Sequence, residues 1–294
     1  MRLKHLLPLI VVTGFFLPLC GQDSPPPPPA PSPVADVPVK PPASGLANNL
    51  EFTPGTQPAA FFPRLGRDAW ALAALPAHAS GRQWRAFGFS LLAIAAVGSD
   101  DQGLRVHHYN ASDDRFARRI RPLGTWIPFA AMGLTWGIGR LSHNPEIAAT
   151  GEDGVEAGLL SLAVVLPVKS ITGRSRPSRE HGPSEFKPFS SGRSFFSAET
   201  ALAFSTATVI SLHTESWWVK GSAYALATAV GWSRRQLNGH WASDIVAGAL
   251  LGIGVGRWTV HRHRPGAAES RVSWDLAPSF GDDGEHGVVM TAHW

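Results

Sequence analysis

The chain of 294 residues contains one cysteine, Cys20. No internal disulfide can therefore form, and a catalytic thiol has no candidate in the folded part because Cys20 lies in a short leader. Net charge is also scarce: of the formal +4, Arg2 and Lys4 in the leader supply +2, which leaves about +2 for the rest of the chain. So small an excess does not favour nucleic acid as a partner.

Long apolar runs and metal-ligand spacings are missing as well. The uncharged stretches after residue 85 are 12 to 18 residues long, whereas a membrane-spanning helix needs about 20. With a mean hydropathy of −0.01, these lengths favour a bundle that is soluble or bound at a membrane surface, and a spanning arrangement stays open. No side chains have zinc-ligand spacing. We expect His261 and His263 to form a solvated helix cap and His213 to lack a partner.

The N-terminus has the pattern of a secretory signal, because Arg2 and Lys4 precede the short apolar stretch Leu6–Leu19. We therefore expect residues 1–21 to be a signal peptide that takes the chain across the inner membrane. The mature protein would then lie in the periplasm or cell envelope. Cys20 is a candidate for acylation as a lipid anchor, although the leucine before it is larger than the residue usual at a lipoprotein cleavage site.

The next segments differ in composition from the remainder of the chain. Residues 22–48 form a proline-rich linker, in which positions 23–43 hold ten of the 25 prolines. Residues 49–85 form an N-terminal extension that mixes proline, glycine and arginine with short apolar patches. Within it we expect one short helix at Asp68–Leu75, stopped by Pro76.

Residues 86–264 predict an all-α domain. Uncharged stretches of helical length alternate there with polar connectors, and no period-two alternation competes with them. Six such stretches predict a bundle of about six helices: Ala86–Ser99, Pro122–Gly139, Ala157–Val168, Thr200–Thr214, Gly221–Ser233 and Ile245–Gly256. Trp217 and Trp218 precede the fifth stretch, where we expect helix-start aromatics of the core, the alternative being an interfacial membrane anchor.

Residues 265–294 change to a different periodicity. Arg271–Phe280 and Glu285–Trp294 alternate apolar and polar residues around a Gly-Asp-Asp-Gly turn. This alternation predicts a short C-terminal β-hairpin. We expect the hairpin to pack on the helical bundle.

The residues with the clearest chemical pattern lie in Ser233–Asp244. Arg234, His240 and Asp244 stand there at the mouth of the apolar segment Ile245–Gly256. If a helix begins at this point, Asp244 lies about one turn beyond His240, and its carboxylate can accept a hydrogen bond from Nδ1 and leave Nε2 free. That arrangement makes a histidine nucleophilic. The alternative is a pair that only caps the helix.

Two further clusters precede this one. They are Lys169-Ser-Ile-Thr-Gly-Arg-Ser-Arg176-Pro177 and Ser194-Phe-Phe-Ser197-Ala198-Glu199-Thr200. The three clusters together resemble the type 2 phosphatidic acid phosphatase superfamily, which also contains bacterial non-specific acid phosphatases and vanadium haloperoxidases. Its pattern is Lys, six residues, Arg-Pro; then Pro-Ser-Gly-His; then Ser-Arg, five residues, His, three residues, Asp. The first and third motifs match completely, but in the second Phe196 replaces Pro, Ala198 replaces Gly and Glu199 replaces His.

The resemblance implies a helical phosphatase that needs no cofactor. His240 would attack a phosphate ester in line and form a phosphohistidine that water then hydrolyses. Asp244 would orient His240. Lys169, Arg176 and Arg234 would hold the phosphate oxygens, for which an ammonium and two guanidinium groups are suited.

The second motif would supply the remaining donors. Ser197 and the backbone N–H of Ala198 would lie at a helix N-terminus, which attracts an anion. In the family the histidine of this motif protonates the leaving oxygen, so we expect Glu199 to be the general acid here. Its alternative role is structural, as a carboxylate that caps the helix or pairs with Arg234.

The expected function is that of a cell-envelope phosphatase acting on a phosphomonoester or diphosphate, with a lipid phosphate as one candidate substrate. One alternative is a vanadate-dependent haloperoxidase, with vanadate in the same basic cradle. Another is a non-catalytic phosphate- or lipid-binding envelope protein. We expect Arg174 and Arg179 to lie in a solvated basic loop without a role. The sequence carries no signal for the oligomeric state.

Overall fold

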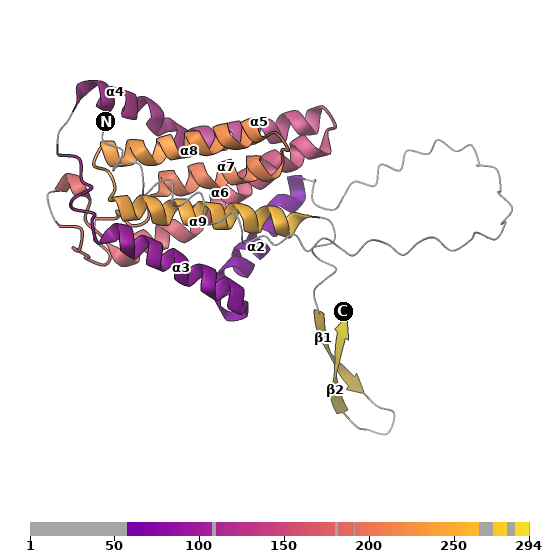
Figure 1. Ribbon diagram of the computed structural model, residues 1–294. Coiled ribbons are helices and arrows are strands. Elements are labelled where there is room, and N and C mark those ends of the chain that lie inside the picture. The colour runs from indigo at the N-terminus through magenta and orange to yellow at the C-terminus, as the bar shows by residue number, and fades with distance from the viewer. Residues whose placement is uncertain are drawn as a thin grey trace, which may run out of the picture.

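The computed structural model describes residues 58–107, 110–179, 182–190, 192–264, 273–280 and 286–293. The described part before residue 265 is helical, so the all-α class is confirmed. The expected number of about six helices is too low, because eight α-helices lie in the described residues (Figure 1). They are α2 Pro58–His78, α3 Gly81–Gly98, α4 Ala111–Ile120, α5 Trp126–Leu141, α6 Pro145–Thr172, α7 Ala198–Leu212, α8 Trp217–Gln236 and α9 Ala242–His263, with the 3-10 helices η3 Arg121–Gly124 and η4 Pro177–Arg179.

Charge explains why α4 is absent from the sequence-based expectation. The six expected helices are all uncharged stretches, whereas α4 carries Asp113 and Asp114 in its first turn and Arg118 and Arg119 in its last. Acidic residues near the N-terminus and basic residues near the C-terminus stabilise a helix through its dipole. The side chain of Asn110 caps this helix by accepting from an amide of its first turn.

Helix α2 corrects the expectation of a short helix at Asp68–Leu75. It runs from Pro58 to His78 and includes Pro76, the residue expected to stop it. A proline inside a helix costs about 3 kcal/mol in isolation, so tertiary contacts must offset it. Asp68 in the middle of α2 is buried against α9, and that contact anchors the helix.

Helix α7 is the centre of the bundle, packed against α6, α8 and α9 (Figure 1). Its contact with α9 depends on a stripe of glycines at positions 248, 252 and 256, four residues apart on one face of α9. A Cβ atom at any of these positions would lie 2.8 Å or less from a backbone oxygen of α7. The missing side chains let the two backbones approach closely, which places the N-terminus of α7 beside the first turn of α9.

A buried ionic cluster joins α2, α6 and α9 at the opposite end of the bundle. His263 Nδ1 is 2.5 Å from Asp153 Oδ1, and His263 Nε2 is 2.9 Å from Asp68 Oδ2. Arg262 donates to Asp68 as well. Burial alone would lower the pKa of His263, but these two carboxylates raise the pKa to about 9. The imidazole is therefore positively charged at neutral pH and donates from both nitrogens.

This cluster overturns two expectations about the histidines. His263 is not part of a solvated cap, and His213 has a partner, since its Nε2 lies 2.8 Å from Asp153 Oδ2. The partners of His263 are 110 and 195 residues away in the sequence. Local spacing contains no information about pairs so distant, because only the packing of the helices brings them together.

The C-terminal residues form two strands, β1 Ser273–Phe280 and β2 His286–His293, paired antiparallel with Ser273 opposite His293. Their side chains, the turn between them and the expected packing on the bundle lie outside the described residues. The same holds for the expected signal peptide 1–21 and the proline-rich linker 22–48.

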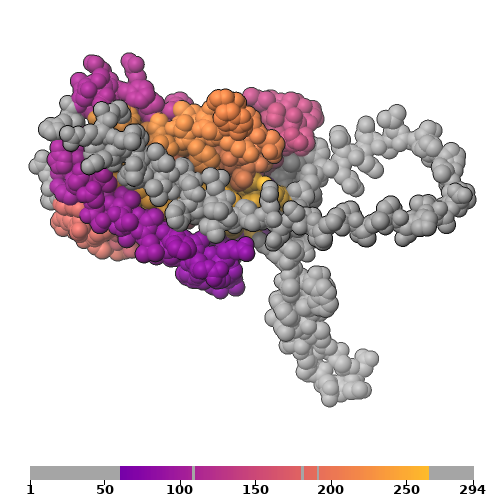
Figure 2. All heavy atoms as spheres, in the orientation of Figure 1, coloured from indigo at the N-terminus to yellow at the C-terminus, as the bar shows by residue number. Residues whose placement is uncertain are grey.

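The helical surface exposes many large apolar side chains. No residue of α3 is buried, and atoms of α3 and α8 reach the face seen in Figure 2. Trp217 and Trp218 stack with ring centroids 3.7 Å apart but are 65% and 68% exposed, so they are not core aromatics. Among the described helices, α6 is long and apolar enough to cross a membrane, and 44% of its most apolar 18-residue window is buried inside the bundle.

Candidate active site

The three clusters singled out in the sequence meet at one end of the bundle, where α6 ends and α7 and α9 begin. The carbonyl oxygen of Ser194, in the second cluster, connects the first and the third. It lies 3.4 Å from Lys169 Nζ and 2.8 Å from His240 Nδ1. Glu199 lies in the first turn of α7 and contacts Arg234 in the last turn of α8, with Oε1 3.6 Å from Arg234 Nε. Residues separated by up to about 70 positions thus surround one small space.

The chain reaches this space from α6 through Gly173, which has a φ of 53°. A Cβ atom there would overlap the carbonyl oxygen of Lys187, so this left-handed C-cap requires glycine. The turn leaves Lys169 pointing at the second cluster, with Nζ 2.9 Å from the carbonyl oxygen of Arg193. Burial lowers the pKa of Lys169 to about 8, although Glu199 partly offsets the effect.

His240 is 2% exposed, and its orientation differs from the expectation. Nδ1 donates to the carbonyl oxygen of Ser194 at 2.8 Å, which leaves Nε2 as the unprotonated nitrogen of the neutral ring. The nearest oxygen of Asp244 lies 3.7 Å from Nδ1, too far for a good hydrogen bond. A backbone carbonyl therefore fixes the ring, while Asp244 acts on His240 through its charge.

Asp244 is fully buried and holds the surrounding segments in place. Its Oδ2 accepts from the hydroxyl of Ser194 at 2.5 Å and from the amide of Trp241 at 2.9 Å. Burial alone would raise the pKa of Asp244, but its contacts with His240, Arg174 and Ser194 lower the pKa below the ordinary value. The carboxylate is thus ionised, and by binding Ser194 it also positions the carbonyl group that orients His240.

Arg174 corrects the expectation of a solvated loop. It is 5% exposed, and its guanidinium lies between two buried carboxylates, 2.6 Å from Asp244 Oδ1 and 2.7 Å from Asp101 Oδ2. Arg179 is exposed, as expected. The sequence pattern does not distinguish Arg174 from Arg179. The difference depends on Asp101, which lies 73 residues before Arg174 in a segment without any local pattern.

Ser197 and Ala198 begin α7 beside His240. The Ser197 hydroxyl is buried and accepts from the amide and the hydroxyl of Thr200 at 3.3 and 2.8 Å, so it caps the helix. Its own amide donates to the carbonyl oxygen of Asp244 at 3.0 Å. The amides of Ala198 and Glu199 belong to the first turn, where helical N–H groups have no intrahelical acceptor and attract anions.

Glu199 points at the expected nucleophile, His240, and at Arg234, which is expected to bind phosphate. Its Oε2 lies 3.4 Å from His240 Nε2, and its Oε1 lies 3.6 Å from Arg234 Nε. Burial alone would raise the pKa of Glu199, but His240 and Arg234 lower the pKa well below its usual range. In the free protein the side chain is therefore a carboxylate, which opposes a proton-donor role unless a bound ligand changes its surroundings.

The space beside Glu199 contains buried polar atoms without hydrogen bonds. His240 Nε2 and both Nε and Nη1 of Arg234 are buried and have no hydrogen-bond partner among the described residues. Leaving such groups unsatisfied costs about 1–3 kcal/mol each. The two Arg234 nitrogens are donors, whereas His240 Nε2 carries a lone pair, so the space suits a ligand that brings acceptor oxygens to Arg234 and a positively polarised atom to His240.

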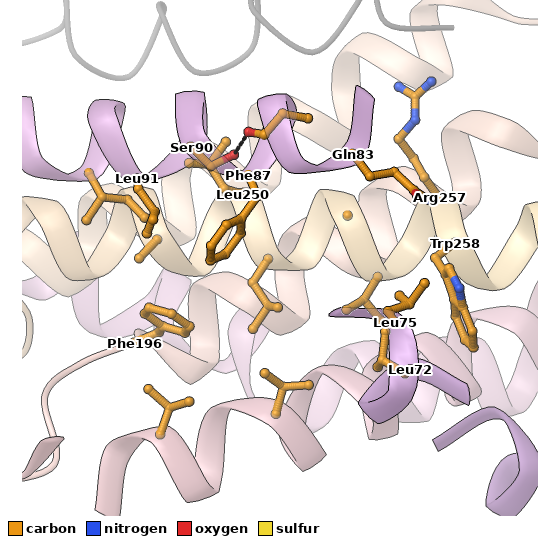
Figure 3. Close-up of a pocket in the computed structure, with 18 of the residues that line it drawn as sticks. Leu72, Leu75, Gln83, Phe87, Ser90, Leu91, Phe196, Leu250, Arg257 and Trp258 are labelled. Carbon is orange, nitrogen blue, oxygen red and sulfur yellow. Dashed lines mark hydrogen bonds between the residues drawn. The ribbon is translucent and has the colours of Figure 1, made fainter. Parts of the chain in front are cut away.

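Two pockets lie near these residues. An apolar cavity of about 1010 Å³ lies between α2, α3, α6 and α9 and reaches Phe196, next to Ser197. Figure 3 shows Phe196, Leu91 and Leu250 at one part of this cavity, with Leu72, Leu75 and Trp258 at the other. The second pocket, of about 260 Å³, is lined by polar groups that include Arg176 and Arg234. Arg176 therefore lies at the mouth, beside Arg234.

A candidate for metal binding occurs elsewhere in the described residues. Asp68, Glu156 and His263 offer ligand atoms within 4.8 Å of one another. Each of them already takes part in the ionic cluster, in which Arg64 donates to Glu156 Oε2 at 2.8 Å. They lie at the far end of α9 from His240, and a helix of 22 residues is about 33 Å long. We therefore interpret the group as structural.

Comparisons with known proteins connect these motifs to a family. Residues 155–265, which contain all three motifs, match the family model described as PAP2 superfamily. A lipid A 1-phosphatase of Porphyromonas gingivalis is 43% identical over 65 residues, which are 21% of this chain and 15% of that protein. The chain thus covers less than a sixth of this curated relative. The crystal structure of Aquifex aeolicus LpxE is 22% identical, with a TM-score of 0.42 and coverage of 58% of this chain and 93% of that chain.

Proposed function

We propose that this protein, whose residues 155–265 match the family model described as PAP2 superfamily, is a phosphatase that hydrolyses a phosphate ester through a phosphohistidine. One observation carries the proposal: His240 Nε2 and two nitrogens of Arg234 are buried without hydrogen-bond partners in the same space. Phosphate oxygens would satisfy the two Arg234 donors, and the unprotonated Nε2 of His240 beside them offers a lone pair to the phosphorus atom of a bound ester. A protein that only bound phosphate would not need an oriented, unprotonated histidine nitrogen.

In the first step, His240 Nε2 attacks the phosphorus atom, and the bond from phosphorus to the leaving oxygen breaks. Negative charge on the three remaining phosphoryl oxygens is neutralised by Lys169, Arg176 and Arg234 and by the first amides of α7. The Ser194 carbonyl accepts a hydrogen bond from Nδ1–H of His240, which keeps its proton, and Asp244 balances the positive charge that develops on the ring. In the second step, water attacks phosphorus, the nitrogen–phosphorus bond breaks, and inorganic phosphate leaves.

Glu199 takes the place of the proton donor in this scheme. A bound phosphate dianion engages Arg234 and adds a negative charge next to the carboxylate, and both changes raise the pKa of Glu199. The side chain then takes up a proton as the ester binds and gives it to the leaving oxygen. In the second step the carboxylate accepts a proton from the attacking water. Substrate binding that requires proton uptake predicts an acidic pH optimum.

A lipid phosphate is the substrate class that the surroundings favour. The apolar cavity of about 1010 Å³ beside Phe196 is suited to an acyl or prenyl chain whose phosphate lies at His240. A curated relative named lipid A 1-phosphatase acts on a phosphate of the same general class. Metal-free catalysis suits this donor set, because cationic side chains and amides already neutralise the phosphoryl oxygens.

We also propose that the protein works at a membrane in the cell envelope. Exposed apolar side chains on α3, α5 and α8 are too numerous for an ordinary soluble surface. They include Trp84, Phe87, Phe89, Leu92, Trp126, Leu134, Ile138, Leu141, Trp217, Trp218 and Leu226. Membrane attachment through this surface would bring lipid substrates to the apolar cavity, and fractionation of cells should place the chain in the membrane fraction.

The purified chain in detergent tests the proposed reaction directly. We expect it to release phosphate from an aryl phosphate without added metal, and vanadate to inhibit competitively by occupying the phosphate site. Bromide oxidation by peroxide with bound vanadate, without phosphate release, would instead support the haloperoxidase alternative. Phosphate or vanadate binding without either reaction would identify a non-catalytic binding protein.

Lys169 makes phosphate binding pH-dependent. Because its pKa is lowered to about 8, the charged form is lost as the pH rises through this value. The inhibition constant of inorganic phosphate should therefore rise above pH 8, by up to about tenfold per pH unit. Lys169→Arg keeps its charge across this range and should lack the step. A step near pH 8 that persists in Lys169→Arg would show that another group titrates.

Glu199→Gln separates the acid role of this residue from a structural one. We expect kcat for alkyl phosphates, whose leaving groups need a proton, to fall by about 10²–10⁴-fold. The loss for aryl phosphates, which are better leaving groups, should be much smaller. Removing the carboxylate from the space between His240 and Arg234 should also make inorganic phosphate a stronger inhibitor at pH 7.

Aryl phosphate is the internal control for this variant. Equal, small losses for both substrates and an unchanged inhibition constant for phosphate would mean that Glu199 only caps α7. Equal, small losses with stronger inhibition by phosphate would mean that Glu199 pairs with Arg234 without donating a proton.

A further inference from the structure

The smaller of the two pockets contains more positive charge than a single phosphate needs. It has a volume of about 260 Å³ and is lined by Asp114, Arg118, Arg121, Arg176, Ser178, Arg234, Leu237 and Gly239. Four arginines thus face one carboxylate. Arg176 and Arg234 also belong to the proposed phosphate cradle, so the pocket continues that cradle towards the surface.

Three of the four arginines of this pocket have no carboxylate partner among the described residues, and the fourth, Arg234, lies 3.6 Å through Nε from Glu199 Oε1. Among the described residues, Arg118, Arg121 and Arg176 form no hydrogen bond or ion pair through their side chains, and Arg234 Nη1 is buried without a hydrogen-bond partner. Burial lowers the pKa of Arg234, Glu199 partly offsets this effect, and Arg121 and Arg176 lower the pKa further, which places these positive charges near one another. Like charges that are close together and unpaired are destabilising unless an anion binds between them.

Two of these arginines come from outside the catalytic motifs. Arg118 lies in the last turn of α4 and Arg121 begins η3, both before the segment 155–265 that matches the family. Helix η3 packs against α7 and α8, and α4 packs against α8. The positions of Arg118 and Arg121 are therefore set by the same helices that carry Glu199 and Arg234.

We propose that Arg118 and Arg121 bind a second phosphate of the substrate, next to the phosphate that His240 attacks. The protein would then prefer diphosphates, or headgroups with two phosphates, over simple monoesters. This inference rests on the proposed function, since it places the second phosphate relative to the reacting one. A guanidinium pair matches a phosphate in charge and geometry, and the pocket is of headgroup size rather than large enough for a lipid chain.

Competitive inhibition of aryl phosphate hydrolysis tests this subsite without a membrane. The probes are inorganic phosphate and methylenediphosphonate, a diphosphate analogue whose bridging carbon prevents hydrolysis. We expect methylenediphosphonate to bind about 10–100-fold more tightly to the native chain, as expected for added charge-assisted hydrogen bonds. In Arg121→Ala, and more so with Arg118→Ala added, the ratio of the two inhibition constants should fall towards one.

Arg119→Ala is the matched control, because Arg119 is an exposed arginine of the same helix that does not line the pocket. It should keep the native ratio, which separates local binding from a general loss of positive charge. Arg118 and Arg121 are exposed, so their variants should fold, as circular dichroism would verify. A native ratio near one, or an unchanged ratio in the double variant, would overturn the subsite. Failure of the native chain to release any phosphate would instead contradict the proposed function.

Discussion

His240→Ala should lose phosphate release by at least about 10⁴-fold, a loss typical of removing a nucleophile, and still bind vanadate. The reason is the division of tasks in the site. In the proposed mechanism His240 supplies the attacking Nε2, whereas Lys169, Arg176 and Arg234 supply the charge that holds the anion. The measurements are single-turnover phosphate release and a vanadate titration. The native chain quenched during turnover should also yield an acid-labile phosphohistidine, and the variant should not.

His107→Ala is the control for this experiment, because His107 is an exposed histidine outside the three motifs. It should retain full activity. Native rates in His240→Ala would contradict the assignment of the nucleophile. Loss of both turnover and vanadate binding would mean that His240 mainly holds the site together.

Arg174→Ala should have the largest effect on stability. It would leave Asp101 and Asp244 as uncompensated buried charges, and removing one partner of a buried pair typically costs about 3–5 kcal/mol. For a chain of this size we expect the melting temperature to fall by about 6–20 °C. Turnover should fall as well, because Asp244 positions the Ser194 carbonyl that orients His240.

Two variants make this result specific. Arg174→Lys keeps one charge but cannot reach both carboxylates with a planar fork, so it should recover part of the stability while kcat stays low and KM changes little. Arg179→Ala removes an exposed arginine of the same sequence cluster and should change the free energy of unfolding by less than about 0.5 kcal/mol. If Arg174→Ala and Arg179→Ala behaved alike, the buried network would not exist in solution.

The helical class and the core helices were predictable because apolar periodicity is a local property. Uncharged stretches marked parts of α3, α5, α6, α7, α8 and α9, since these helices bury one or more faces. Helical segments that carry charged residues were not predicted from uncharged stretches. Helix α4 is strongly charged, and α6 begins before its uncharged part with Glu152, Asp153 and Glu156, all buried, whose charges are balanced only by residues of other helices.

The sequence by itself determined which residues to examine: Lys169, Arg176, Arg234, His240 and Asp244 were identified because their spacing follows a short linear pattern. It also located the replacement at Glu199. These are statements about order along the chain, and they need no coordinates. The distances between the residues depend on how α6, α7, α8 and α9 pack.

Only the tertiary structure decided how those residues interact. The acceptor for His240 Nδ1 is the Ser194 carbonyl and not Asp244. Arg174 is buried and not solvated, and the pKa of Glu199 is lowered by His240 and Arg234 although burial opposes this. The tertiary structure also brought Arg118 and Arg121 beside the cradle. In each case the deciding partner lies far away in the sequence, and hydrogen bonds and charge interactions depend on separations of a few ångströms that no local pattern encodes.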